Sequence, residues 1–196
     1  MVGFKFIGKK ILQKESEGEI FVAGFEESLG GLVGDQTRDK DAATIGLIIS
    51  ELASDLQKHN KTLGEKLDEI YSEIGFFTEK TESVEFSGSD GFNKMQEIMQ
   101  KVKSGEETFG ATKIKDFDNL TEINVATGEK SKFNMLEGGN AVSFEFIKPE
   151  NRITIRPSGT EPKIKIYAQW LFDKKEDCAK IEEIITDFKR RILNEC

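Results

Sequence analysis

A turn between two strand-like runs near the C-terminus constrains the fold of this chain more than any other segment. The runs cover residues 151–155 and 163–172, and the residues between them, 156–162, read RPSGTEP. A tight connection between two strands needs only residues such as Gly, Pro, Asn or Asp. This connection adds a guanidinium group, two hydroxyl groups and, on the second strand, the ammonium group of Lys165. The segment therefore predicts a β-hairpin whose tip carries more polar groups than a chain reversal requires.

The additional groups of this hairpin suit the binding of a phosphate dianion. Arginine offers a planar bidentate fork, hydroxyl groups donate to oxygen, and successive backbone N–H groups form an anion-binding nest. An ordinary polar hairpin is the alternative interpretation, but it needs fewer anion donors than this turn contains. We therefore predict a phosphate-binding site formed by Arg156, Ser158, Gly159, Thr160 and Lys165.

Three motifs together resemble those of one enzyme family. Residues 156–163, RPSGTEPK, resemble the phosphate-binding loop in the last domain of the α-D-phosphohexomutases, which include phosphoglucomutases and phosphomannomutases. Residues 24–28, GFEES, resemble the sugar-binding loop of that family, and residues 38–42, RDKDA, resemble its Arg-x-Lys-Asp segment. The motifs occur in the order of the family. The resemblance extends over nearly the whole chain, which matches only the later part of such an enzyme.

The resemblance implies a sugar-binding role for Glu26 and Ser28. A carboxylate acceptor and a hydroxyl group suit the neighbouring hydroxyl groups of a hexose, and the loop follows the end of a predicted strand, where ligands meet open sheets. The alternative is a solvated acidic turn, since charged residues are mostly exposed. Glu27 falls at the more variable middle position of the motif, so the motif supports it less as a ligand.

Lys40 is the catalytic candidate that the resemblance implies. Taken alone, it is a surface lysine near the start of a helix, between Asp39 and Asp41. The family motif places it facing the active cleft, where a lysine could exchange a proton with the attacking hydroxyl group. A lysine needs a lowered pKa to act as a base at neutral pH, and two flanking aspartates would raise that pKa. We therefore favour electrostatic binding of phosphate or hydroxyl by Lys40 over general-base catalysis.

Composition argues against several classes of protein. The chain has 196 residues and a formal net charge of −8, whereas nucleic-acid binders usually carry a basic excess. It contains no apolar run near the ~20 residues of a membrane helix, and residues 1–14 lack the apolar region of a signal peptide. Only 2 cysteines are present, which suits a reducing compartment. We therefore expect a cytoplasmic protein that binds neither nucleic acid nor membrane.

Hydrophobic periodicity predicts two domains separated by a polar linker. We expect residues 1–87 to be the C-terminal part of an α/β domain, which the resemblance identifies as the sugar-binding third domain, and residues 88–196 to be a phosphate-binding α+β domain with an antiparallel sheet packed against helices. The first domain is predicted to contain helices at 3–14, 42–56 and 62–74, a buried strand at 19–25 and an extended segment at 76–86. The second is predicted to contain a helix at 92–102, strands near 111–117, 140–147, 151–156 and 163–172, and a closing helix.

Capping residues mark the expected starts of three helices, and they are Asp39 or Asp41, Thr62 with Glu65, and Asp173 with Glu176. The first domain nevertheless looks incomplete, because one convincing core strand and three helices cannot cover both faces of a sheet. We therefore expect the chain to be a fragment whose partner is the missing N-terminal part of the same polypeptide.

The resemblance implies a full-length parent that interconverts hexose 1-phosphate and hexose 6-phosphate through a bisphosphorylated intermediate. Such an enzyme is an intramolecular phosphotransferase of the isomerase class, and its partner is a phosphosugar substrate. The phosphoserine loop and the Asp-Gly-Asp magnesium loop of the family do not occur in these 196 residues. We therefore expect Mg²⁺ in the parent, no bound cofactor or metal in this fragment, and no activity of the fragment alone.

Two alternative functions stay open at this point. A phosphoglucosamine mutase usually carries Gln in the sugar loop, where this chain has Glu27. A non-catalytic phosphosugar-binding module would use the same recognition groups without any chemistry. Phosphates of glucose, mannose and a pentose are all compatible with these motifs.

Overall fold

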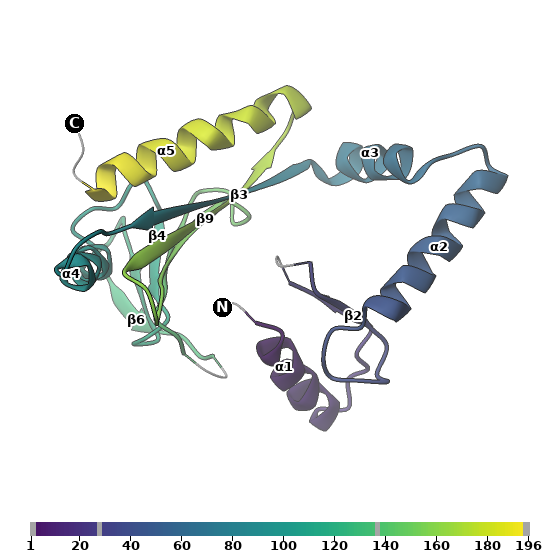
Figure 1. Ribbon diagram of the computed structural model, residues 1–196, viewed down its shortest axis with the longest axis horizontal. Helices are drawn as coiled ribbons and strands as arrows, with labels where there is room; N and C mark the ends of the chain where they lie inside the picture. Colours follow the sequence, from purple (N-terminus) through teal and green to yellow (C-terminus); the bar gives the residue numbers. More distant parts are fainter. Residues whose placement is uncertain (1–2, 27–28, 136–137, 194–196) are drawn as a thin grey trace. The chain divides into compact units, whose positions relative to one another are not determined.

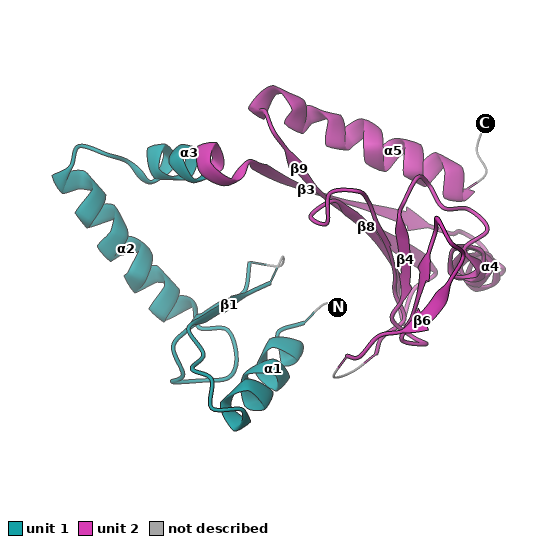
Figure 2. Cartoon of the chain, turned by 180° about the vertical axis from the view of Figure 1, so that it is seen from behind, with its two compact units in different colours: residues 1–70 teal, residues 71–196 magenta. Residues whose placement is uncertain are grey.

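The computed structural model describes residues 3–26, 29–135 and 138–193. Its contacts divide the chain into two compact units, residues 1–70 and residues 71–196 (Figure 2). The division falls earlier in the chain than the sequence pattern predicted, which was after residue 87.

Unit 1 consists of helices and one short antiparallel ribbon (Figure 1). Its elements are α1 (Lys5–Ser16), β1 (Ala23–Phe25), β2 (Gly31–Val33), α2 (Ala42–Lys58) and most of α3 (Leu63–Ile74). Gly24 of β1 lies opposite Leu32 of β2. The buried strand predicted at 19–25 is shorter in the structure, because among the described residues only β2 pairs with it. Ile20 and Val22 are consequently 90% and 72% exposed.

Side-chain caps explain where α2 and α3 begin. Asp41, one of the two predicted caps, accepts hydrogen bonds through Oδ1 from the N–H groups of Ala43 (3.0 Å) and Thr44 (3.2 Å) at the start of α2. Hydrogen bonds from Thr44, its hydroxyl group first, lower the pKa of Asp41. The predicted capping box precedes α3, where Thr62 N–H donates to Glu65 Oε2 (2.7 Å) and Glu65 N–H donates to Thr62 Oγ1 (3.2 Å).

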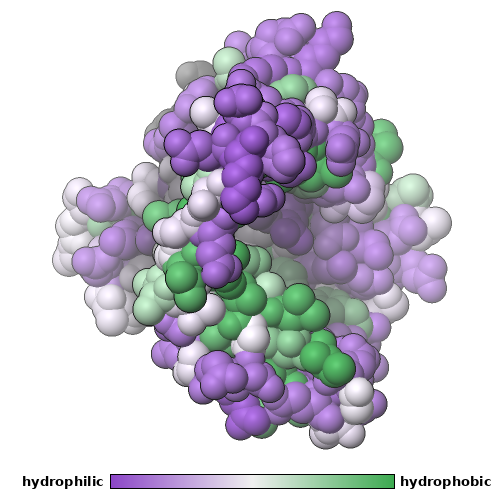
Figure 3. Space-filling view, turned by 90° about the vertical axis from the view of Figure 1, so that its right-hand side faces the viewer, coloured by the Kyte–Doolittle hydropathy of each residue, from purple (hydrophilic) through white to green (hydrophobic). Residues whose placement is uncertain are grey.

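The hydrophobic core of unit 1 is small. It comprises Phe4, Ile11 and Leu32, with Ile7 and Phe21 packed against them. By contrast, α2 exposes large apolar side chains, among them Leu47 (62% exposed) and Ile49 (46% exposed). Figure 3 views the molecule from the side on which α2 lies in Figure 1 and shows a continuous hydrophobic area on that face. The described part of unit 1 therefore leaves much of the apolar face of α2 uncovered.

Unit 2 is an α+β structure built on an antiparallel sheet, as the sequence predicted. Its sheet has the strand order β3-β9-β8-β7-β4-β5-β6, and every described neighbouring pair is antiparallel (Figure 1). The strands are β3 (Phe76–Glu85), β4 (Lys113–Asp116), β5 (Thr121–Asn124), β6 (Lys130–Lys132), β7 (Val142–Glu145), β8 (Arg152–Pro157) and β9 (Lys163–Phe172). The helices are α4 (Gly91–Ser104), the short 3-10 helix η1 (Lys175–Ala179) and α5 (Lys180–Leu193).

The pairing of β3 explains where the chain divides. β3 pairs with β9 along its whole length, from Phe76 opposite Phe172 to Glu85 opposite Lys163. Directly after β3, the N–H group of Phe86 donates to Pro162 O (2.9 Å). The extended segment that the sequence assigned to the first domain is thus a strand of unit 2, and the predicted linker at 87–91 joins two elements of that same unit.

The core of unit 2 lies between the sheet and helices α4 and α5. Alternate residues of β8 and β9, including Ile155 and Ile166, are fully buried on the face that these helices cover. Phe109, Phe144 and Phe188 form an aromatic cluster within this core, with ring centroids 4.4 to 5.5 Å apart. Because side chains alternate between the two faces of a strand, the opposite face of β8 and β9 carries their polar residues.

The last helix begins differently from the prediction. η1 precedes α5, and its N-cap residue Lys174 makes no side-chain capping hydrogen bond, so the predicted capping box of Asp173 and Glu176 is not formed. Asp173 instead pairs with Lys148 (2.8 Å). The closing helix that the sequence predicted is α5, and its buried face consists of Ile181, Ile185, Phe188 and Ile192. No helix in the described residues has the length and apolar character needed to cross a membrane.

Candidate functional site

The predicted phosphate clamp lies at one end of the β8–β9 hairpin. Arg156 of β8 is the cross-strand partner of Lys165 on β9, and both side chains are exposed. Their neighbours Ile155 and Ile164 are fully buried on the helix-covered face. Because successive side chains of a strand point to opposite faces, Arg156 and Lys165 both project from the face that α4 and α5 leave open.

Hydrogen bonds within the loop fix the shape of the hairpin tip. Ser158 N–H donates to Lys163 O (2.8 Å), and Lys163 N–H donates to Glu161 O (2.8 Å). The hydroxyl oxygen of Ser158 accepts from the N–H groups of Thr160 (3.4 Å) and Glu161 (3.2 Å). Ser158 therefore organises the loop through its oxygen and keeps its own O–H group to donate. Gly159 and Thr160 are exposed at the tip.

The charges around the loop leave two cations for an anionic ligand. Glu161 forms an ion pair with Lys163. The hydrogen bond from Lys163 lowers the pKa of Glu161, and the charge of Lys165 lowers it further by a smaller amount. Glu161 in turn raises the pKa of Lys163. Arg156 and Lys165 make no side-chain hydrogen bond or ion pair within the described ranges of the chain. All predicted clamp residues thus lie together on one hairpin, with its two unpaired cations side by side.

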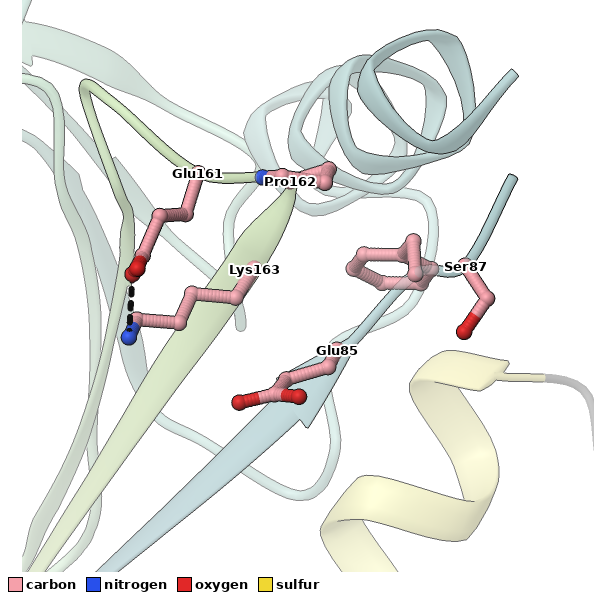
Figure 4. Close-up of a pocket in the computed structure, with 6 residues that line it drawn as sticks. Glu85, Ser87, Glu161, Pro162 and Lys163 are labelled. Carbon is pink, nitrogen blue, oxygen red and sulfur yellow. Dashed lines mark ion pairs between the residues drawn. The ribbon is translucent and has the colours of Figure 1, made fainter. Parts of the chain in front are cut away.

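A pocket that the sequence did not predict adjoins this hairpin. It has a volume of about 240 Å³ and is lined by Glu85, Phe86, Ser87, Glu161, Pro162 and Lys163 (Figure 4). The pocket exists because the end of β3 lies beside the start of β9, a contact between segments far apart in the chain. The sequence holds no local signal for that contact.

The second predicted site lies in unit 1, at the end of β1. Lys40 Nζ lies 3.5 Å from Glu26 Oε1, and the carboxylate-bearing side chain is 9% exposed whereas the lysine side chain is 53% exposed. Glu26 N–H donates to Gly30 O (2.8 Å), which holds Glu26 close to β2. Asp41 N–H donates to Gly31 O (2.9 Å), which holds the residue after Lys40 close to the same strand. The structure therefore brings two predicted site residues together. Ser28, the third, lies outside the described residues, as does Glu27.

Gly30 makes this approach possible. A Cβ atom at Gly30 would lie 2.5 Å from Glu26 Oε1 and 2.9 Å from Lys40 Cδ, closer than real side-chain contacts allow. A glycine at this position lets the carboxylate and the lysine stem pack over the backbone.

The acidic neighbours of Lys40 are engaged elsewhere. Asp39 Oδ1 accepts from the N–H group of Lys40 (2.8 Å), and Asp41 caps α2. The carboxylate that lies near the ammonium group of Lys40 is therefore that of Glu26 and not that of either flanking aspartate. Arg38 forms an ion pair with Glu15 (2.8 Å).

The described residues contain no group of three or more His, Cys, Asp or Glu side chains that could hold a metal ion. Two of their carboxylates have other roles, since Glu161 pairs with a cation and Asp41 caps a helix. These residues do not fit the ligand set that Mg²⁺ requires, which combines carboxylate oxygens with water or phosphate.

Comparison with known proteins places both sites within one family. Residues 1–74 match the model described as phosphoglucomutase/phosphomannomutase, alpha/beta/alpha domain III, and residues 122–189 match the model of the C-terminal domain of the same family. The first match contains Glu26 and Lys40 and ends at the last residue of α3, and the second contains the hairpin clamp.

Individual relatives agree with these matches. The phosphoglucomutase of Staphylococcus aureus (strain USA300) is 32% identical over 181 residues, which are 92% of this chain and 33% of the relative. The phosphoglucomutase of Staphylococcus saprophyticus is 33% identical over 202 residues, which correspond to 99% of this chain and 34% of the relative. The chain thus spans about a third of the length of the curated relatives that it matches. Both domain matches, these relatives and the two sites lead to one conclusion: the chain belongs to the phosphoglucomutase/phosphomannomutase family and carries residues of its third and its C-terminal domains.

Proposed function

We propose that this chain is the substrate-recognition part of a phosphoglucomutase that interconverts hexose 1-phosphate and hexose 6-phosphate. The observation that carries the proposal is the pair of Arg156 and Lys165, which stand side by side on an open sheet face without an ion-pair partner in the described residues. Beside them the exposed loop residues Gly159 and Thr160 supply a backbone N–H group and a hydroxyl group, respectively. Together these groups form a binding site for the dianionic phosphate of the substrate.

The two sites divide the recognition of the phosphosugar between them. The clamp binds the phosphate that is not reacting, and it serves both ends of the sugar because the bisphosphorylated intermediate binds in two orientations. Glu26 accepts hydrogen bonds from sugar hydroxyl groups, and Ser28 of the same motif is proposed to assist it. Lys40, 3.5 Å from Glu26, contributes positive charge toward the phosphate or the attacking hydroxyl group.

The remaining chemistry belongs to other parts of the parent polypeptide. Phosphoryl transfer relies on positioning and on stabilisation of charge in the transition state. This chain supplies the positioning of the sugar and of its distal phosphate, and Mg²⁺ held by the rest of the parent would neutralise charge on the transferred phosphoryl group. We propose that glucose phosphates are the substrates, because the relatives named as phosphoglucomutases match nearly the whole chain.

The clamp can be tested by titrating inorganic phosphate into the full chain and following backbone amide shifts by NMR. Arg156→Ala should weaken binding by about 1.5–3 kcal/mol, the scale of hydrogen bonds to charged groups, and should leave the fold intact. Arg156→Lys should restore part of the affinity, since lysine supplies charge but no bidentate fork.

The matched control is Arg152→Ala, because Arg152 lies on the same strand and the same face but is engaged with Gln169. It should leave phosphate affinity unchanged. Unaltered affinity in Arg156→Ala, with the loop amide shifts still moving on titration, would place the phosphate somewhere other than the clamp.

A further inference from the structure

The open face of the unit 2 sheet arranges the clamp and its surroundings in rows that cross the strands. One row consists of Ser83, Lys165 and Arg156, contributed by β3, β9 and β8. The next row consists of Glu85 opposite Lys163. Residues two apart on a strand share a face and are separated by roughly 7 Å. Glu85 therefore lies in the row next to the one that contains the two cations of the clamp.

The row of Glu85 borders the pocket beside the hairpin. Its volume of about 240 Å³ lies just below the range of roughly 300–1,000 Å³ of pockets for drug-sized ligands, a size that suits a single sugar ring. In Figure 4 the carboxylate of Glu85 points toward the side of the pocket on which Glu161 and Lys163 form their ion pair, while the hydroxyl group of Ser87 points away from that pair. The charged groups of the pocket thus lie on one side of it, and Glu161 and Lys163 on that side belong to the hairpin that carries the clamp.

Glu85 differs from the other carboxylate of the pocket in having no hydrogen-bond donor. Glu161 is paired with Lys163. The side chain of Glu85 makes no hydrogen bond or ion pair in the part of the chain that the structure describes. It acts on Lys163 only through its charge, which adds to the effect of Glu161 in raising the pKa of that lysine. An exposed carboxylate with unfilled acceptor positions suits a ligand that brings hydroxyl groups.

The sign of the charges then fixes which end of a ligand goes where. A phosphate dianion is attracted to the row of Lys165 and Arg156. In the next row the charge of Lys163 is balanced by its ion pair with Glu161, so the unpaired carboxylate of Glu85 repels the dianion there. Neutral hydroxyl groups have the opposite preference, because they donate to carboxylates. A phosphosugar satisfies both rows at once, with its phosphate on the cations and its ring one row further along the strands.

We propose that this pocket is a sugar subsite and that Glu85 accepts hydrogen bonds from hydroxyl groups of the sugar whose phosphate occupies the clamp. The inference rests on the proposed function, since it takes the phosphate to be bound at Arg156 and Lys165. In this role Glu85 is a specificity-determining residue, because its carboxylate distinguishes a phosphosugar from a phosphate ester that has no hydroxyl groups.

The test compares two ligands on the full chain, glucose 1-phosphate and methyl phosphate, by isothermal titration calorimetry. Glu85→Ala should weaken glucose 1-phosphate about tenfold, the scale of hydrogen bonds to a charged group, and leave methyl phosphate binding unchanged or slightly tighter. Glu79→Ala is the matched control, because Glu79 lies on the same strand and face but accepts a hydrogen bond from Gln169. It should change neither affinity.

A repeat in the Glu26→Ala background separates the pocket from the sugar loop of unit 1. A tenfold effect of Glu85→Ala that persists there supports the subsite, and an effect that disappears overturns it. Equal loss of both ligands in Glu85→Ala, or no loss of either, also overturns it. Should Glu85→Ala fail to fold, Glu85→Gln is measured in its place and is expected to produce a smaller loss in the same direction. Methyl phosphate affinity that is insensitive to Arg156→Ala would contradict the clamp itself, and with it both proposals.

Discussion

At the scale of single residues, the contact between Glu26 and Lys40 depends on the absence of a side chain at Gly30. Gly30→Ala would bring a Cβ atom within 2.5 Å of Glu26 Oε1. The clashing atoms belong to flexible side chains, so the carboxylate should move away while the fold survives. We expect weaker binding of glucose 1-phosphate with a change in unfolding free energy below about 1 kcal/mol, measured by calorimetry and thermal unfolding.

The control for this substitution is Gly46→Ala in α2, where an added Cβ atom would meet nothing within 4 Å. This change should stabilise the helix by about 1 kcal/mol and leave ligand affinity as it is. Equal affinities of the Gly30→Ala and Gly46→Ala variants would argue against a role of the Glu26 position in sugar binding.

A second residue-scale prediction concerns the titration of Glu161. Its pKa is lowered chiefly by the hydrogen bond from Lys163. The ion pair therefore stabilises the folded chain above the ordinary glutamate pKa of about 4.3, and that contribution is lost as the pH falls through the lowered value. In Lys163→Ala the pKa of Glu161 should rise toward its ordinary value, and in Lys165→Ala it should rise less. Side-chain NMR titration measures both, and a larger effect of Lys165→Ala would reverse the assignment of partners.

At the scale of elements, local signals in the sequence predicted the helices and the hairpin well. The capping box of Thr62 and Glu65 forms as predicted, and the predicted closing helix is present as α5. Elements that the sequence did not predict lack such signals. An example is β6, the short and exposed strand Lys130–Lys132. The residues of the proposed clamp could be grouped from the sequence alone, because they lie close together in it. Glu85 could not be grouped with them, because its place beside the hairpin follows from the pairing of β3 with β9.

The buried face of α5 also permits an element-scale prediction about stability. Ile185 is fully buried between α5 and the sheet. Ile185→Ala should lower the unfolding free energy of unit 2 by about 2–5 kcal/mol, because it leaves a cavity in the core. Ile147→Ala removes the same atoms from a side chain that is 88% exposed, and it should change the unfolding free energy by less than about 0.5 kcal/mol. Denaturant unfolding followed by the fluorescence of Trp170, the 1 tryptophan of the chain, reports on this unit. Similar costs for both substitutions would contradict the packing of α5.

At the scale of the whole molecule, the two units differ in how well they bury their apolar residues. Unit 2 has an extensive core, whereas the buried core of the described part of unit 1 is a small cluster around Phe4, Ile11 and Leu32. We therefore expect amide hydrogen exchange to be faster in α2 than in α5, since protection follows local burial. Comparable protection of the two helices would show that the apolar face of α2 is covered in solution.

The chain alone should also show no mutase turnover. We expect it to lack the phosphoserine loop and the Asp-Gly-Asp loop that the family resemblance implies for the parent. A coupled assay for the conversion of glucose 1-phosphate to glucose 6-phosphate, with Mg²⁺ present, should therefore equal the buffer control. Turnover that is present in the purified chain and lost in Arg156→Ala would refute this expectation, because the dependence on the clamp would exclude a contaminating enzyme.

The antiparallel pairing of β3 with β9 has a consequence for the order in which the binding surface assembles during folding. β8 and β9 are joined by a short loop, so their hairpin closes at little entropic cost. β3 must find β9 across most of the length of unit 2, and such non-local pairing is slow. We therefore expect the proposed phosphate clamp to form early in folding and the pocket that contains Glu85 to form only when the edge strand β3 docks. A nascent or partly folded chain would recognise the phosphate before it could recognise the sugar.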